Sequence, residues 1–222
     1  MTISKANQTD MEEKGWIQFT LDGRPVKARE GWTVLDTARE YGVDIPTLCH
    51  HPAVEPSGAC RMCVVEAREG NWSKVVVSCM YPPYEGVEIL TDSPRVLNVR
   101  RWVLEMLLAK APASAAIRAL ARRYGVNSSR FRVEDPTEEC ILCGLCVRIC
   151  EEVVGVQALS FGGRGTAKHI ATPYMIPNAS CVACGTCLMV CPTGAMQARY
   201  DRIRGNVSER IGPGRTFIGG VK

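Results

Sequence analysis

Cysteine is the residue that most constrains what this chain can form. Twelve of its 222 residues are cysteine, and only three, His50, His51 and His169, are histidine. The first residues show no apolar core and no twin arginine, so we expect a cytoplasmic protein, in which thiols stay reduced and bind metal rather than pair. Because zinc sites commonly recruit histidine, this ratio favours iron–sulfur clusters held by thiolates alone.

The second half of the chain contains an approximate repeat, with cysteine-rich runs that begin at Cys140 and Cys181. Each run follows the spacing C-x2-C-x2-C-x3-C, in which the first three thiolates hold one 4Fe-4S cluster and the fourth reaches the other. Gly144 and Gly185 are expected to let backbone amides approach the sulfur atoms. The spacing predicts two crossed ligand sets: Cys140, Cys143, Cys146 and Cys191 for one cluster, and Cys181, Cys184, Cys187 and Cys150 for the other.

In bacterial two-cluster ferredoxins a proline follows the fourth cysteine of such a run. Here Pro192 follows Cys191, but Glu151 follows Cys150. Only the second run therefore has a proline to stop its helix.

A looser set of cysteines lies in the amino-terminal half: Cys49, Cys60, Cys63 and Cys79. Cys60 and Cys63 come from one turn, and the other two come from separate loops, which suits a 2Fe-2S cluster. Zinc remains an alternative for this set. A Rieske-type site would use His50 and His51, but four cysteines already complete a cluster, so we expect these histidines and His169 to pack or hydrogen-bond instead.

Hydrophobic periodicity predicts an α+β chain. Apolar and polar residues alternate from Trp16 up to the Asp22-Gly23 turn, and a helix is predicted after Thr33. Strand, strand and helix in this order open a β-grasp domain. A second hairpin turns at residues 69–71, and residues 87–90 read as a last strand. The expected division is a flexible leader over 1–14, a 2Fe-2S β-grasp domain over 15–92, a helical connector over 93–134, a two-cluster 4Fe-4S domain over 135–203 and an extended tail over 204–222.

The formal net charge of +4 counts every cysteine as neutral. Three oxidised clusters with their thiolates would add about −6, so the basic balance does not by itself indicate nucleic acid. Nine of the basic residues fall in residues 95–132, which contain a single acid, Glu105. These arginines and lysines form either a solvated helix face or a docking surface for an acidic partner.

The motifs resemble a known family. The stretch Ile45–Glu66, which contains Cys49-His50-His51 and Ala59-Cys60-Arg61-Met62-Cys63, followed by the paired repeats, resembles the iron–sulfur electron-transfer (diaphorase) subunit of NAD-linked hydrogenases. It is similar also to the amino-terminal region of the large iron–sulfur subunit of complex I and of NAD-dependent formate dehydrogenase. The resemblance covers roughly residues 16 to 200.

One departure from the family concerns a further cluster, bound there by one histidine and three cysteines. The matching segment here, Leu107–Ala116, has alanine in place of the histidine, and no cysteine lies between Cys79 and Cys140. We therefore predict that this cluster is absent.

The three sets use all twelve cysteines, and we find no dinucleotide fingerprint, P-loop or nucleophile elbow. The chain is thus expected to act in an enzyme only as a non-catalytic electron-transfer subunit. The resemblance implies as partners a flavin and NAD(P)-binding subunit and a hydrogenase, formate dehydrogenase or ferredoxin-linked module, with no membrane span. A free multi-cluster ferredoxin is the alternative, and a zinc-dependent nucleic-acid module is a remote third reading.

Overall fold

A computed structural model of the chain describes residues 15–172, 174, 179–197, 199 and 200. The predicted leader and the predicted tail lie outside these residues. The chain divides into two compact units, described separately below: the first takes residues 1–47 and 60–103, and the second takes Leu48–Ala59 and the chain from Leu104 onward.

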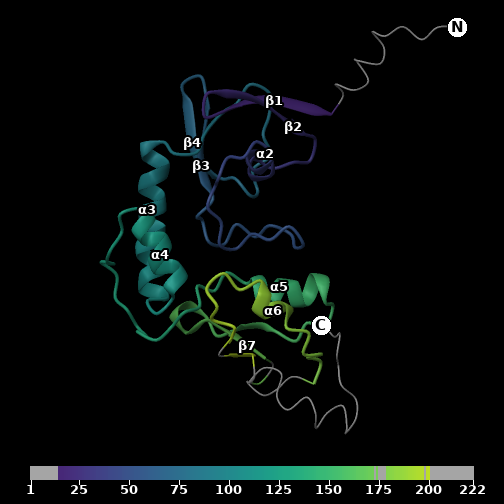
Figure 1. The fold of residues 1–222 in the computed structure, drawn as a ribbon, viewed down its shortest axis with the longest axis vertical. Coiled ribbons are helices and arrows are strands. Elements are labelled where there is room, and N and C mark those ends of the chain that lie inside the picture. The colour runs from purple at the N-terminus through teal and green to yellow at the C-terminus, as the bar shows by residue number, and fades with distance from the viewer. Residues whose placement is uncertain (1–14, 173, 175–178, 198, 201–222) are drawn as a thin grey trace, which may run out of the picture. The chain divides into compact units, whose positions relative to one another are not determined.

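The first unit is built on a five-stranded mixed sheet (Figure 1). Its strands are β1 (Trp16–Leu21), β2 (Arg24–Arg29), β3 (Val64–Glu69), β4 (Trp72–Val77) and β5 (Glu88–Leu90), in the order β2-β1-β5-β3-β4. β1 and β5 run parallel, and the other neighbours are antiparallel. Both predicted hairpins and the predicted last strand are present.

Local sequence explains the first hairpin and the helix that follows. Asp22 and Gly23 both have positive φ, +48° and +77°, which suits the tight turn of a twisted hairpin. Thr33 caps α2 (Val34–Glu40) by accepting from the Asp36 amide, while the Asp36 carboxylate accepts from the Thr33 amide in return. The helix covers a core of buried side chains that include Leu21, Val26, Ala28, Leu35, Val65 and Ile89.

The helix α3 (Pro94–Lys110) begins where the sheet ends. The Ser93 hydroxyl accepts from the Val96 amide and so caps the helix. Arg100 is buried, and it donates to the Asp92 carboxylate at 2.9 Å and to the Val64 carbonyl at 2.9 Å. The helix start is thereby tied to strand β3 within the first unit.

The second unit has short elements around the cysteine repeats. They are α4 (Ala115–Arg123), α5 (Leu145–Arg148), the π-helical η1 (Ile149–Val153), β6 (Ser160–Gly162), the 3-10 turn η2 (Gly165–Ala167), β7 (His169–Ala171) and α6 (Thr186–Met189). Figure 1 shows α5 and α6 beside each other, and they are in contact.

Helix α4 starts at its Ser114 cap, two residues after Pro112, so the segment predicted as a helical connector contains two helices, α3 and α4. Strands β6 and β7 pair antiparallel and form a hairpin that the sequence did not indicate. A mixed sheet in the first unit, together with separate helices, is consistent with the predicted α+β class. Within the described part of the chain, no helix has both the length and the apolarity that a membrane crossing requires.

Candidate metal centres

The two cysteine repeats have the same backbone geometry. In the first run Leu142 (φ +55°) and Gly144 (φ +76°) are left-handed, and in the second run Ala183 (φ +56°) and Gly185 (φ +75°) are left-handed. Glycine adopts this conformation without steric cost, whereas leucine and alanine pay about 1 to 2 kcal/mol for it. Left-handed residues among right-handed ones curl the backbone so that its amides converge, which is how protein loops surround an anionic cluster.

Three thiols of the first repeat lie near Cys191 of the second. Burial, together with the neighbouring Cys140, Cys191 and Cys49, raises the pKa of the Cys143 thiol to about 11, although a hydrogen bond from the Leu145 backbone opposes the shift. Burial also lifts the pKa of Cys146 far above its usual range, with Cys143, Cys140 and Cys191 among the neighbours that contribute.

The second repeat closes around a cavity. Four thiols line it, those of Cys150, Cys181, Cys184 and Cys187, together with apolar side chains such as Ile149 and Leu159. Burial raises the pKa of Cys187 to about 11, helped by Cys184, Cys181 and Cys150. Cys150, from the first repeat, thus lies with three cysteines of the second.

Hydrogen-bond donors surround the sulfur atoms of the repeats. The Leu142 amide donates to Cys140 Sγ at 3.4 Å, and the Ala158 amide donates to Cys150 Sγ at 3.3 Å. The Thr186 hydroxyl donates to Cys184 Sγ at 3.3 Å. Such donors stabilise thiolates and tune the potential of a cluster that the thiolates hold.

The amino-terminal cysteines are all buried. Cys63 and Cys79 belong to the core of the first unit. Cys60 and Cys63 flank Arg61, which is left-handed at φ +59° as Leu142 and Ala183 are. Cys49 instead lies in the Leu48–Ala59 segment, which belongs to the second unit.

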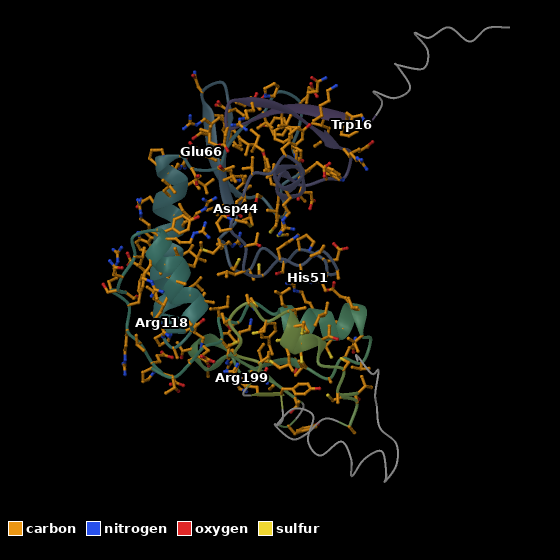
Figure 2. The ribbon with its side chains drawn as sticks, viewed as in Figure 1. Trp16, Asp44, His51, Glu66, Arg118 and Arg199 are labelled. Atoms are coloured by element: carbon orange, nitrogen blue, oxygen red, sulfur yellow. The ribbon has the colours of Figure 1, made fainter. Side chains whose placement is uncertain are left out.

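Charged side chains that the sequence analysis did not single out also reach the repeats. Arg199 (labelled in Figure 2) donates to both carboxylate oxygens of Glu138, at 2.7 and 2.9 Å. The same carboxylate accepts from the Cys140 amide at 2.8 Å. Although burial opposes its charge, Cys140 and Glu138 raise the pKa of Arg199, so a cation is held beside the first repeat. Arg148, between Cys146 and Cys150, contacts the Leu48–Ala59 segment.

His51 and His169 have ordinary hydrogen-bond contacts. His51 (Figure 2) accepts at Nδ1 from the Ala53 amide at 3.2 Å, and His169 Nδ1 lies 2.8 Å from the Ala167 carbonyl.

The donor chemistry of the cysteine sets fits iron–sulfur clusters. All twelve cysteines are free thiols, and the lining of the second-repeat cavity is otherwise largely apolar, which suits a cluster better than a hydrated ion. Among the described residues no three His, Cys, Asp or Glu side chains converge as closely as one metal ion requires. A cluster is larger than one ion and spreads its thiolates correspondingly further apart.

Comparison with known proteins identifies the family. Residues 15–94 match the model of a 2Fe-2S iron-sulfur cluster binding domain, and residues 139–195 match that of a 4Fe-4S dicluster domain. A chain in the crystal structure of an NAD+-reducing NiFe hydrogenase, in the H2-reduced state, has 35% sequence identity and a TM-score of 0.61, over 70% of this chain and 74% of that chain. This chain belongs to the same family of iron–sulfur subunits as that hydrogenase chain. The family that the cysteine motifs indicate, the iron–sulfur subunits of NAD-linked hydrogenases, is thus confirmed.

Curated relatives are named as subunits of NADH dehydrogenase and NADH-ubiquinone oxidoreductase. The mitochondrial NADH dehydrogenase (ubiquinone) iron-sulfur protein 1 of Solanum tuberosum is 34% identical over 179 residues, which are 70% of this chain and 24% of that protein. The 75 kDa subunit of NADH-ubiquinone oxidoreductase from Reclinomonas americana is 33% identical over 179 residues, 70% of this chain and 26% of that subunit. The chain therefore spans about a quarter of the length of these relatives. It carries the family's 2Fe-2S domain followed by its 4Fe-4S dicluster domain.

Proposed function

We propose that this chain relays single electrons inside a cytoplasmic multi-subunit oxidoreductase, between a flavin and NAD(P)-binding subunit and a hydrogenase, formate dehydrogenase or ferredoxin-linked module. Relatives named as NADH dehydrogenase and NAD+-reducing hydrogenase support both ends of this relay. The chain itself is not the site of substrate chemistry.

The observation that carries the proposal is the grouping of the thiols. Four cysteines drawn from both repeats line one cavity, and Cys140, Cys143 and Cys146 of the first repeat have Cys191 of the second as an electrostatic neighbour. With the remaining four as a third set, every cysteine is used and no ligand position stays open for substrate. Iron–sulfur clusters bound in this way accept and release one electron at a time.

The chain's own residues hold and tune these centres. The proposed ligands are Cys49, Cys60, Cys63 and Cys79 for one 2Fe-2S cluster, Cys140, Cys143, Cys146 and Cys191 for one 4Fe-4S cluster, and Cys181, Cys184, Cys187 and Cys150 for the second. Amide and hydroxyl donors at Cys140, Cys150 and Cys184 offset the negative charge of the thiolates. Arg199 adds a cation on the Cys140 side.

An anaerobic reduction experiment tests the relay. NADH delivers a hydride, which a flavin must split before a one-electron centre can accept it. We expect the purified chain to be bleached by dithionite, to stay unbleached with NADH alone, and to be bleached by NADH once the flavin-containing subunit of an NAD+-reducing hydrogenase is added. Rapid bleaching by NADH without a second protein would contradict the proposal.

Size-exclusion chromatography of the native protein separates this proposal from a diffusible ferredoxin. We expect elution in a complex well above the 24.3 kDa of the chain. Elution of all native protein as a free 24.3 kDa species would favour the diffusible carrier instead.

A further inference from the structure

The loop Leu48–Ala59 connects the two kinds of cysteine motif. It contains Cys49, a proposed ligand of the 2Fe-2S cluster, yet it belongs to the unit that holds the two 4Fe-4S repeats. Its Val54 side chain is buried against Leu145 of α5 and Ile149 of η1, with Cys143 packed at the edge. One ligand of the two-iron site is therefore seated on the first cysteine repeat.

Backbone groups of this loop are held by two charged side chains. Arg148 Nη2 donates to the Cys49 carbonyl at 2.7 Å, and its Nη1 donates to the Glu55 carbonyl. Glu152, one turn further along, accepts from the Glu55 amide at 2.8 Å. The guanidinium forms a planar fork with donors in fixed directions, so it fixes the spacing of the two carbonyls, which a lysine ammonium cannot do.

Arg148 lies in the chain between proposed ligands of the 4Fe-4S clusters. It lies between Cys146 and Cys150, which are proposed ligands of different 4Fe-4S clusters, and it touches the backbone of a ligand of the third cluster. Through Arg148, a short path of covalent and hydrogen bonds joins Cys49 to Cys146. The guanidinium also puts a positive charge beside Cys49, and a positive charge near a ligand favours the reduced, more negative state of the cluster that the ligand holds.

The internal repeat provides a comparison. Arg148 is the second residue after Cys146, and Met189 is the second residue after Cys187. Helices α5 and α6 both start after a left-handed glycine, yet the Met189 side chain is 87% exposed. Val190 of the second repeat also packs against the Val54 cluster, but among the described contacts the hydrogen bonds to the loop backbone come from Arg148 and Glu152. The cysteine motif itself does not require arginine at this position, so the contacts with the Cys49 loop account for Arg148.

We propose that Arg148 is a positioning residue for electron transfer: it clamps the Cys49 loop onto the first cysteine repeat and thereby sets the coupling and the potential of the 2Fe-2S cluster. This inference rests on the ligand sets of the proposed function. Arg148 coordinates no metal and acts through the backbone of Cys49 and Glu55.

The test uses the full chain with three variants, Arg148→Met, Arg148→Lys and the matched control Met189→Gln. Methionine keeps an unbranched apolar stem but removes the fork and the charge. The readouts are an anaerobic redox titration of the two-iron electron paramagnetic resonance signal and the acceleration of its spin relaxation by reduced 4Fe-4S clusters. Iron content confirms that each variant is fully loaded.

We expect Arg148→Met to shift the two-iron potential downward and to weaken the relaxation enhancement. Arg148→Lys should restore most of the potential but not the full enhancement, and Met189→Gln should match the parent in both. A parent-like potential and relaxation in Arg148→Met would overturn the proposal.

If that variant loses its two-iron signal, Arg148→Lys decides: an intermediate phenotype supports the clamp, and parent-like behaviour overturns it. A parent protein without a two-iron signal would instead overturn the ligand assignment on which the clamp rests.

Discussion

At the scale of single residues, the two cysteine repeats differ most in their contact with solvent. Cys140 and Cys146 of the first repeat are buried, whereas Cys184 of the second is exposed and its neighbours Cys181 and Cys187 are half-buried. Exposure decides how easily oxidants reach a thiolate or the cluster that it holds. The two sites have similar backbone geometry, but oxidants should therefore attack the second one faster.

Limited oxidation should damage the second site first. Brief exposure of the loaded protein to ferricyanide, followed by alkylation of the released thiols, should label Cys181, Cys184 and Cys187 before Cys140 and Cys146. Peptide mass spectrometry measures the order. Labelling of both repeats at the same rate would show that the difference in exposure has no chemical effect.

A single substitution should remove the two-iron site alone. Cys63 lies in the core of the first unit, whereas all eight repeat cysteines lie in the second. We expect Cys63→Ser to abolish the two-iron signal of dithionite-reduced protein and to leave both four-iron signals in electron paramagnetic resonance. In the control, Cys184→Ser should remove one four-iron signal and keep the two-iron signal. Soluble Cys63→Ser protein that has lost all three signals would contradict this modular account.

At the scale of elements, the junction between strand β3 and helix α3 depends on one buried carboxylate. Hydrogen bonds from Ser93 and Arg68 lower the pKa of Glu66, which lies on β3 (Figure 2) and is nearly inaccessible to solvent. Arg95, in the first turn of α3, lies 4.0 Å from the same carboxylate. Ser93 also caps α3, so the strand, the cap and the helix share one network.

Replacement of Glu66 should reduce stability in a pH-dependent way. Because the pKa of the folded carboxyl lies below the ordinary 4.5, its stabilisation is present above pH 4.5 and is lost as the pH falls through the lower, folded-state value. We expect Glu66→Gln to lower the free energy of unfolding by about 1 kcal/mol at pH 7. Denaturant unfolding at pH 7 and below pH 4.5 measures the difference, which should shrink in acid. A loss that stays constant across this range would mean that Glu66 acts by packing rather than by charge.

The parts of the chain that the sequence predicted well are those in which a side-chain pattern fixes the local structure. The alternation of β1, the Thr33 cap and the left-handed glycines after Cys143 and Cys184 can be recognised from residue types alone. The β6–β7 hairpin was missed because its strands have three residues each and show no alternation. The seating of the Cys49 loop was missed because Arg148 binds backbone carbonyls, which leave no signature in the sequence of the loop.

At the scale of the whole molecule, the proposed relay has three closed centres, and we expect no further cluster. The segment in which related subunits are expected to bind an extra cluster forms the end of α3, a Ser114-capped turn and the start of α4. Ala111 and Ser114 of this segment are buried, the Ser114 hydroxyl caps α4, and Arg118 (Figure 2) donates to the Pro112 carbonyl, so the segment has structural contacts of its own. The segment contains no cysteine to hold iron.

Quantitative iron and acid-labile sulfide analysis of the fully loaded chain tests this claim most directly. One 2Fe-2S cluster contributes two iron atoms and two 4Fe-4S clusters contribute eight, so we expect about ten iron and about ten sulfide per chain. A count near fourteen would show a further 4Fe-4S cluster and contradict the account. A saturated count near eight would contradict it from the other side, because the amino-terminal cysteines would then hold no iron.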